Sequence, residues 1–195
     1  SESVFALACA RAPGGMEISE VAAAQPGRIA LWSDQGTMSF AELNAQANRL
    51  VRRMRAAGLA AGDAVALVCS NRSEFAVVRF ATHRAGLRLT PINWHLAPED
   101  IRYIVENAEA QALFLDTRVA AVAPGCARIA QRRLRVSIGG ERPDFTNGPD
   151  ALAGMDGSDI PDPTLGAIIL YTSGTTGRPK GVYRPPLDPA HAAQM

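Results

Sequence analysis

An unbroken apolar run at residues 64–69, Ala-Val-Ala-Leu-Val-Cys, limits the folds open to this chain more than any other segment. It has the length of a strand, and a strand without polar/apolar alternation is typical of one that is buried on both faces. Similar short runs occur at 28–33, 87–92, 112–115, 134–138 and 167–171. The sequence therefore predicts a sheet that is covered by helices on both sides.

Segments with helical periodicity alternate with these runs. Ser39 and Glu42 form a capping-box pattern at the start of a helix that we predict over 40–57, and Gly58 is placed to end it. Asn71 or Ser73 is the expected cap of the next helix. The remaining helices are predicted over 73–85, 98–108 and 117–130, with a single helical turn over 151–155.

This order of strands and helices predicts a layered α/β fold with a mostly parallel sheet flanked by helices. The chain divides into four parts by composition. They are an N-terminal segment (1–27), an α/β subdomain (28–138), a connecting segment dense in Gly, Pro, Asp and Asn (139–163), and a strand with a Gly/Thr loop (164–195).

Charge and cysteine usage exclude several classes of function. The chain has 20 Lys and Arg against 19 Asp and Glu, so it lacks the positive surplus that nucleic acid binding needs. No run of about 18 apolar residues occurs, so no transmembrane segment is predicted. Cys9, Cys69 and Cys126 are too far apart for a zinc or disulfide pattern. Cys69 is predicted to be a buried, reduced thiol, which favours a cytoplasmic location.

The residues that carry chemistry lie in the loop after the last predicted strand. This loop contains Lys180, the only lysine among 195 residues, and three glycines within residues 174–181. Glycines let a backbone approach a ligand closely, and successive N–H groups in such a loop form an anion-binding concavity. Hydroxyl groups that can donate to phosphate oxygens are present on Thr172, Ser173, Thr175 and Thr176. The loop therefore predicts a polyphosphate site.

This loop is not the phosphate-binding loop of P-loop nucleotidases. That motif needs G-x-x-x-x-G-K-[ST]; counted from Gly174, Pro179 stands where the second glycine belongs, and Gly181 follows Lys180. A surface loop of small polar residues is the alternative that composition alone leaves open.

The order of residues at 172–181, Thr-Ser-Gly-Thr-Thr-Gly-Arg-Pro-Lys-Gly, resembles the signature loop of the adenylate-forming superfamily. This superfamily includes acyl-CoA synthetases, aryl-CoA ligases, luciferases and peptide-synthetase adenylation domains. Segments 37–43, 84–93 and 96–101 resemble weaker blocks of the same family in the same order. The resemblance runs from about residue 29 onward and implies the N-terminal part of the family's large domain.

The resemblance also implies substrates and a phosphate site. Such enzymes activate a carboxylic acid with ATP and Mg²⁺ and then transfer the acyl group to a thiol, commonly CoA. The implied ligands of the ATP phosphates are Thr172, Ser173, Gly174, Thr175, Thr176, Gly177 and Lys180, with Thr176 as a candidate Mg²⁺ contact. No catalytic residue is assigned, because the family's remaining blocks lie beyond the equivalent of Met195. We therefore interpret the chain as a fragment and expect it to be inactive alone.

Three functions remain open at this stage. The first is part of a carboxylate–CoA ligase for a fatty or aryl acid, which Asn93 favours because adenylation domains usually have aspartate there. The second is part of a peptide-synthetase adenylation domain, and the third is a non-catalytic nucleotide-binding module. A homodimer is a further expectation, because an apolar face left uncovered favours self-association.

Overall fold

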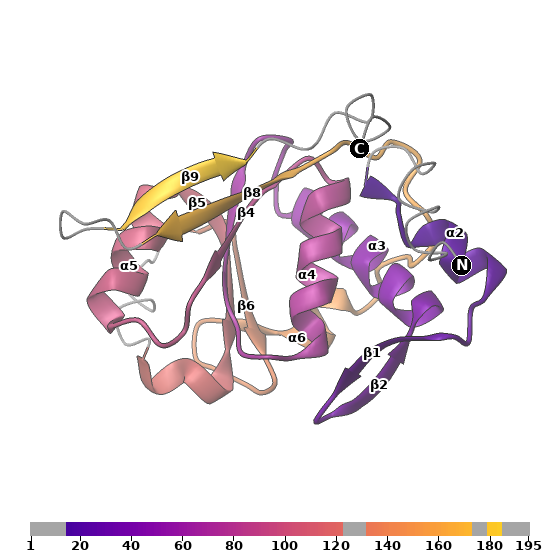
Figure 1. Cartoon of the computed structure of the whole chain (residues 1–195), viewed down its shortest axis with the longest axis horizontal. Helices are drawn as coiled ribbons and strands as arrows, with labels where there is room; N and C mark the ends of the chain where they lie inside the picture. Colours follow the sequence, from indigo (N-terminus) through magenta and orange to yellow (C-terminus); the bar gives the residue numbers. More distant parts are fainter. Residues whose placement is uncertain (1–14, 123–131, 173–178, 185–195) are drawn as a thin grey trace.

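A computed structural model of the chain describes residues 15–122, 132–172 and 179–184 (Figure 1). Its helices are α2 (Ser19–Ala24), α3 (Phe40–Ala56), α4 (Ser73–Arg84), α5 (Pro98–Asn107), the 3₁₀ helix η2 (Thr117–Val122) and α6 (Gly148–Leu152). Its strands are β1 (Ile29–Ser33), β2 (Gly36–Ser39), β3 (Ala64–Val68), β4 (Arg88–Ile92), β5 (Ala110–Asp116), β6 (Leu134–Ile138), β7 (Thr146–Asn147), β8 (Ala167–Thr172) and β9 (Lys180–Arg184).

A seven-stranded sheet forms the centre of the molecule, in the order β7-β6-β5-β3-β4-β8-β9. All neighbouring strands are parallel except β8 and β9, which form an antiparallel pair. The predicted layered, mostly parallel sheet is therefore confirmed. β1 and β2 form a separate antiparallel hairpin.

Helices cover both faces of the sheet, as Figure 1 shows with α3 and α4 on one side and α5 on the other. Each face has its own apolar core, and successive residues of one strand enter different cores. Val65 and Leu67 of β3 pack with the α3 and α4 side chains, whereas Ala66 and Val68 pack with those of α5. All five residues of β3 are buried, which accounts for the unbroken apolar run in the sequence.

The first long helix begins and ends where its local sequence predicts. The Ser39 side chain accepts a hydrogen bond from the Glu42 amide, and the Glu42 carboxylate accepts one from the Ser39 amide, so the capping box is formed. Gly58, just after the helix, has a φ of 84° that favours glycine.

The predicted cap of α4 is wrong. Arg72 occupies the N-cap position and makes no side-chain capping bond, while Ser73 is already the first helical residue. The Arg72 guanidinium instead donates to the Glu74 carboxylate at 3.0 and 3.2 Å. An ion pair within the first turn thus holds this helix start in place of a capping hydroxyl.

Two other predicted helices differ from their observed form. The helix expected over 117–130 begins as a 3₁₀ helix that ends at Val122, and residues 123–131 lie outside the described part of the chain. The Asp116 carboxylate accepts the Arg118 amide at 2.9 Å, a local turn that competes with regular α-helix. The turn expected over 151–155 begins earlier, at Gly148, because Pro149 fits the first helical turn.

The stretch predicted as a connecting segment lies along α3. Arg52 donates to the carbonyl oxygens of Asp156 and Ser158 at 2.9 and 2.7 Å, and Asn48 donates to the Asp159 carboxylate at 2.9 Å. These bonds span more than a hundred residues of sequence. The domain boundaries themselves stay a prediction.

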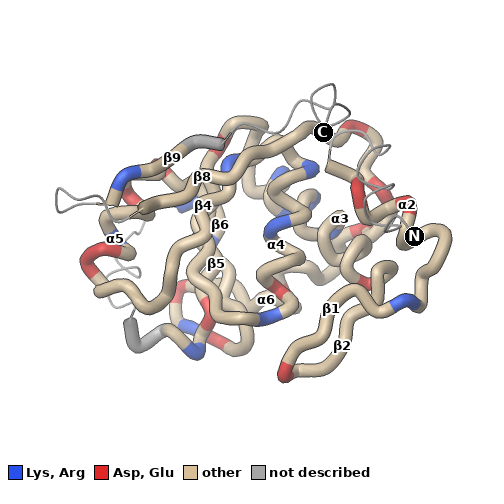
Figure 2. The backbone as a smooth tube through the Cα atoms, in the orientation of Figure 1, with Lys and Arg blue, Asp and Glu red and all other residues tan. Residues whose placement is uncertain are grey.

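Basic and acidic residues are interspersed along the described chain, as Figure 2 shows. The described helices include none that is both long enough and apolar enough to span a membrane.

Candidate functional site

The root of the predicted phosphate loop is the antiparallel pair of β8 and β9. In its register Thr172 faces Lys180, and Tyr171 faces Gly181. Residues directly opposite each other on paired strands project from the same face of the sheet. The last residue before the loop and the only lysine of the chain therefore lie side by side, and both are exposed.

The other predicted phosphate ligands fall within the loop itself. Ser173, Gly174, Thr175, Thr176 and Gly177 lie outside the described residues, so their assignment stays a prediction. The same holds for Thr176 as a Mg²⁺ contact. In the part of the chain that the structure describes, no group of three or more His, Cys, Asp or Glu side chains is arranged to hold a metal ion.

This hairpin begins at the carboxyl edge of the parallel sheet. β8 runs parallel to β4, with Arg88 opposite Ala167 and Leu89 opposite Ile168. The carboxyl ends of β3, β4, β5, β6 and β8 therefore share one edge, which is where ligands bind in open α/β sheets. Lys180 accordingly brings a positive charge to the edge where a phosphate site is expected.

Tyr171 fixes the root of the hairpin to α5. Its hydroxyl donates to the Asn107 side-chain oxygen at 2.7 Å. Burial raises the pKa of Tyr171 and neighbouring Tyr103 adds to this, so the phenol stays protonated and able to donate. A β-carbon on Gly181 would lie 3.1 Å from Tyr171 Cζ, so the glycine leaves room for the ring. The tyrosine and the glycine together set how closely β9 approaches β8.

A second polar group lies at the same edge, and sequence reasoning did not predict it. The chain passes from β4 over β3 to β5, so the ends of β3 and β5 form the point where the winding of the sheet reverses. Asp116, fully buried there, accepts hydrogen bonds from the Ser70 hydroxyl and the Ser70 amide. Arg72 and Arg118 have guanidinium nitrogens 3.9 and 3.7 Å from its carboxylate.

The charges of this second group balance one another. Burial alone would raise the pKa of Asp116, but the hydrogen bonds from Ser70 and from the Arg118 amide, with the charge of Arg72, lower it below its ordinary value. Arg118 also donates to the Ser70 hydroxyl at 2.7 Å, and Arg72 pairs with Glu74. The group, which we call the switch-point cluster, therefore braces the loops after β3 and β5. The signal in the sequence was an acidic residue directly after a buried strand.

Two histidines and a tryptophan outside the loop have structural partners. His83 lies 2.9 Å from the Glu17 carboxylate, and the His95 ring stacks on Trp94 with ring centroids 3.5 Å apart. Trp94 packs against the core on the α5 side. Cys69 is a buried free thiol, as expected, and its burial raises its pKa to about 12.

Asn93 in the sequence favours a CoA ligase over an adenylation domain, and its contact in the structure bears on that choice. Its side-chain oxygen accepts a hydrogen bond from the His95 amide at 3.0 Å, which holds the turn after β4. An aspartate carboxylate can accept the same bond. Its contact therefore gives no reason why asparagine is preferred over aspartate here.

Comparisons with known proteins agree with this geometry. A family described as AMP-binding enzyme matches residues 18–185. The chain is 31% identical over 175 residues to an indoleacetate–CoA ligase of Aromatoleum aromaticum, covering 85% of this chain and 34% of that protein. It is 30% identical over 164 residues to tyrocidine synthase 3 of Brevibacillus parabrevis, covering 82% of this chain and 2% of that protein.

A solved structure has the same fold. The anthranilate CoA ligase AuaEII, in complex with anthranoyl-AMP, superimposes with a TM-score of 0.78 at 21% identity, covering 87% of this chain and 34% of that one. The family match spans most of the sequence, so this chain belongs to the AMP-binding enzyme family. It spans about a third of the length of the CoA ligases that it resembles.

Proposed function

We propose that this chain is part of an ATP-dependent carboxylate–CoA ligase, which joins a fatty or aryl acid to AMP and then to CoA. The observation that carries the proposal is the pairing of Thr172 with Lys180 at the carboxyl edge of the sheet. Family membership supports it, because the loop between these two residues has the family's signature sequence. The acid carboxylate attacks the α-phosphate, pyrophosphate leaves, and the CoA thiol then displaces AMP.

In this proposal the chain's own residues bind and orient the leaving pyrophosphate. Lys180 neutralises charge on the β- and γ-phosphates, and Thr172 donates a hydroxyl beside it. Ser173, Thr175 and Thr176 add hydroxyl groups, and the backbone at Gly174 and Gly177 adds N–H donors. Preorganised donors aimed at developing charge are the main means by which such transfers are accelerated. Mg²⁺, when bound, neutralises phosphate charge, and Thr176 is the residue proposed to contact it.

An adenylation domain of a peptide synthetase is the second candidate. Identity to the CoA ligase and to the peptide synthetase is nearly the same, at 31% and 30%, so identity does not separate them. Asn93 favours the ligase only through the family pattern, since its hydrogen bond suits either residue. The third candidate, a nucleotide-binding module, shares the loop but would not activate an acid.

We further propose that these 195 residues bind ATP without turning over an acid. The predicted role of the loop residues is to hold phosphates, and acyl transfer is assigned to none of them. The cytoplasm is the proposed compartment, which the buried free thiol of Cys69 supports.

A homodimer through the β8–β9 edge is proposed as well, because Leu170 and Val182 are 37% and 44% exposed on strands at the end of the sheet. Light scattering at increasing protein concentration tests this last point.

The decisive experiment measures ATP affinity of the chain and of its Lys180→Ala variant by calorimetry. Loss of one charge-assisted contact to phosphate is expected to weaken binding about tenfold. Arg28→Ala is the matched control, because Arg28 is an exposed cation at the start of the distant β1–β2 hairpin and its removal changes the net charge equally. Equal affinity of Lys180→Ala and the parent chain would contradict the assignment of Lys180.

A second measurement separates the three candidate functions. Acid-dependent exchange of pyrophosphate into ATP, by a protein that contains this chain, is expected for a ligase or an adenylation domain and not for a binding module. Subsequent release of AMP that depends on CoA is expected for the ligase alone.

A further inference from the structure

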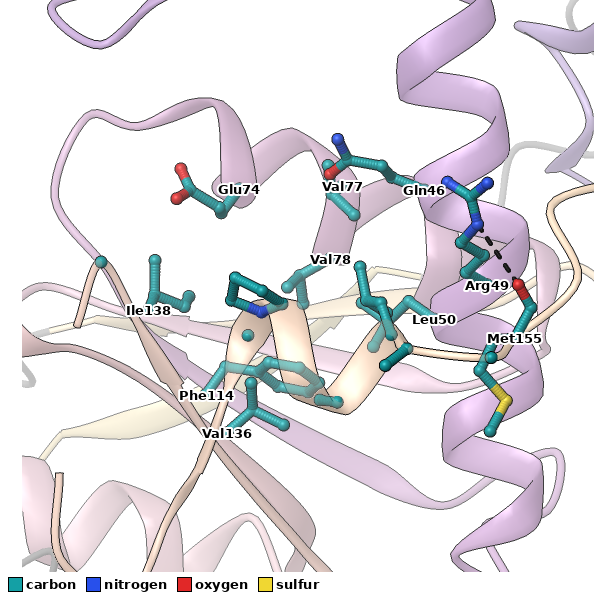
Figure 3. Close-up of a pocket in the computed structure, with 17 residues that line it drawn as sticks. Gln46, Arg49, Leu50, Glu74, Val77, Val78, Phe114, Val136, Ile138 and Met155 are labelled. Carbon is teal, nitrogen blue, oxygen red and sulfur yellow. Dashed lines mark hydrogen bonds between the residues drawn. The ribbon is translucent and has the colours of Figure 1, made fainter. Parts of the chain in front are cut away.

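A cavity of about 560 Å³ lies on the sheet face opposite α5, and the function proposed above does not use it. It is lined by residues of α3, α4, α6 and the strands β5 and β6 (Figure 3). No residue of β8 or β9 lines it, so it is separate from the root of the phosphate loop. Its volume falls within the range of small-molecule sites, which is roughly 300–1,000 Å³.

The wall formed by α6 and the residues after it explains why this space is not filled. This wall presents small residues, including Gly148, Ala151, Ala153 and Gly154. The facing walls, which α3, α4 and the strands β5 and β6 form, present larger apolar side chains. These apolar residues are Leu50, Val77, Val78, Phe114, Val136 and Ile138. The small side chains of the α6 wall do not reach the facing walls, so the space between them is lined but not filled.

Polar groups lie at the two ends of the cavity, and only one end has a charged side chain without an ion pair of its own. Glu74 stands at one end, where Arg72 already neutralises it at 3.0 Å. Gln46 and Arg49, one turn apart on α3, stand at the other end, as Figure 3 shows. Among the described residues no carboxylate lies within ion-pair distance of Arg49; Asp156, which pairs with Arg52 at 3.4 Å, acts on it from further away. The Arg49 Nε donates to the Met155 carbonyl oxygen at 3.3 Å, which orients the guanidinium.

We propose that this cavity binds a small monocarboxylic acid with a compact apolar body. The carboxylate is held by Arg49, whose planar fork suits it, and by the Gln46 amide. The apolar body lies along Phe114 and Val136 on the sheet. Charge selects the ligand class, because the apolar lining suits many molecules, whereas a guanidinium without an ion pair of its own favours an anion. This site is independent of the proposed ligase function, so either can fail without the other.

The test is a titration of the chain, followed through methyl groups by NMR, with octanoate and with its uncharged analogue octanamide. Octanoate is expected to give saturable shifts at the methyls of Leu50, Val78 and Met155. Octanamide is expected to bind about tenfold more weakly, because it lacks the charge-assisted bonds to Arg49. Shifts confined to other methyls, or no saturable shift, would overturn the proposal.

Three variants localise the effect. Arg49→Gln is expected to weaken octanoate about tenfold and to leave octanamide unchanged. Arg49→Lys keeps the charge and is expected to restore part of the affinity. Arg52→Gln is the matched control, because Arg52 lies one turn further along α3 and does not line the cavity. Equal binding of octanoate and octanamide, or equal loss in Arg49→Gln and Arg52→Gln, would overturn the carboxylate assignment. Should Arg49→Gln fail to fold, the comparison of the two ligands on the unchanged chain still decides the question.

Discussion

Two polar groups at the same edge of the sheet differ in how their charges are balanced. In the switch-point cluster, Asp116 is fully buried and shares its carboxylate among Ser70, Arg72 and Arg118. At the root of the phosphate loop, Lys180 is exposed and has no ion pair among the described residues. A buried charge that loses its partner is costly to the fold, whereas an exposed and unpaired charge is free to meet a ligand. At this edge the switch-point cluster therefore holds the fold together, and the root of the phosphate loop is suited to binding a ligand.

Asp116→Asn is expected to have the largest effect on stability. The substitution keeps the shape of the side chain but leaves Arg72 and Arg118 without their buried partner, which costs about 3 kcal/mol of unfolding free energy. Urea denaturation measures this. Asp156→Asn is the control, because Asp156 also pairs with an arginine but its side chain is 65% exposed. A similar loss in both variants would remove the distinction between buried and exposed pairs.

Acid provides a second way to break the switch-point cluster. The pKa of Asp116 lies below its ordinary value of 3.8 in the folded chain, so its charge contributes stability at neutral pH. That contribution is fully present above the ordinary pKa and is lost as the pH falls through the lower folded value. The difference in unfolding free energy between the parent chain and Asp116→Asn should therefore shrink below about pH 4. Glu17 has a lowered pKa too, but it lies outside the cluster and both proteins contain it, so its effect cancels in the difference.

Tyr171→Phe is expected to have an intermediate effect. It removes the hydrogen bond to Asn107 from a half-buried site and should lower the unfolding free energy by about 1 kcal/mol. A double-mutant cycle with Asn107→Ala measures the coupling. If the two losses simply add, the bond does not hold the hairpin root. ATP affinity should fall in Tyr171→Phe as well, because the loop begins two residues later.

Lys180→Ala is expected to have the smallest effect on stability and so sharpens the comparison. An exposed side chain without a partner contributes little to folding, so the urea midpoint should match that of the parent chain. The same variant should lose ATP affinity, as described above. A clear loss of stability would show that Lys180 has a structural role, as the residues of the switch-point cluster do.

Local signals were enough to predict much of the fold. The capping box of Ser39 and Glu42 and the buried run of β3 depend on residues close together in sequence, and both are confirmed. α4 begins at Ser73 as predicted, but its cap was predicted wrongly, because Arg72 at that position forms ion pairs with Glu74 and the distant Asp116. Side chains that bond across the fold override the local preference for a capping hydroxyl.

The phosphate loop was predicted from its residue types, and the structure adds the pairing of Thr172 with Lys180. It could not be predicted that Tyr171 would bond to Asn107, which is 64 residues away. The cavity could not be predicted either, because Arg49 of α3 contacts Met155, which is 106 residues away in the sequence. Periodicity states which face of a helix is apolar but not which distant segment will lie against it.

The sequence by itself determined β1, β3, β4, β5, β6 and β8, the mostly parallel character of the sheet and the loop that resembles the family's signature, because each depends on short runs of residues. The helix α2 and the strands β2, β7 and β9 were not predicted. The tertiary structure alone decided the strand order β7-β6-β5-β3-β4-β8-β9, the partners of Asp116 and the space beside Arg49. These depend on contacts between segments far apart in the chain. Such contacts form only when the helices pack on the sheet and bury apolar surface from water.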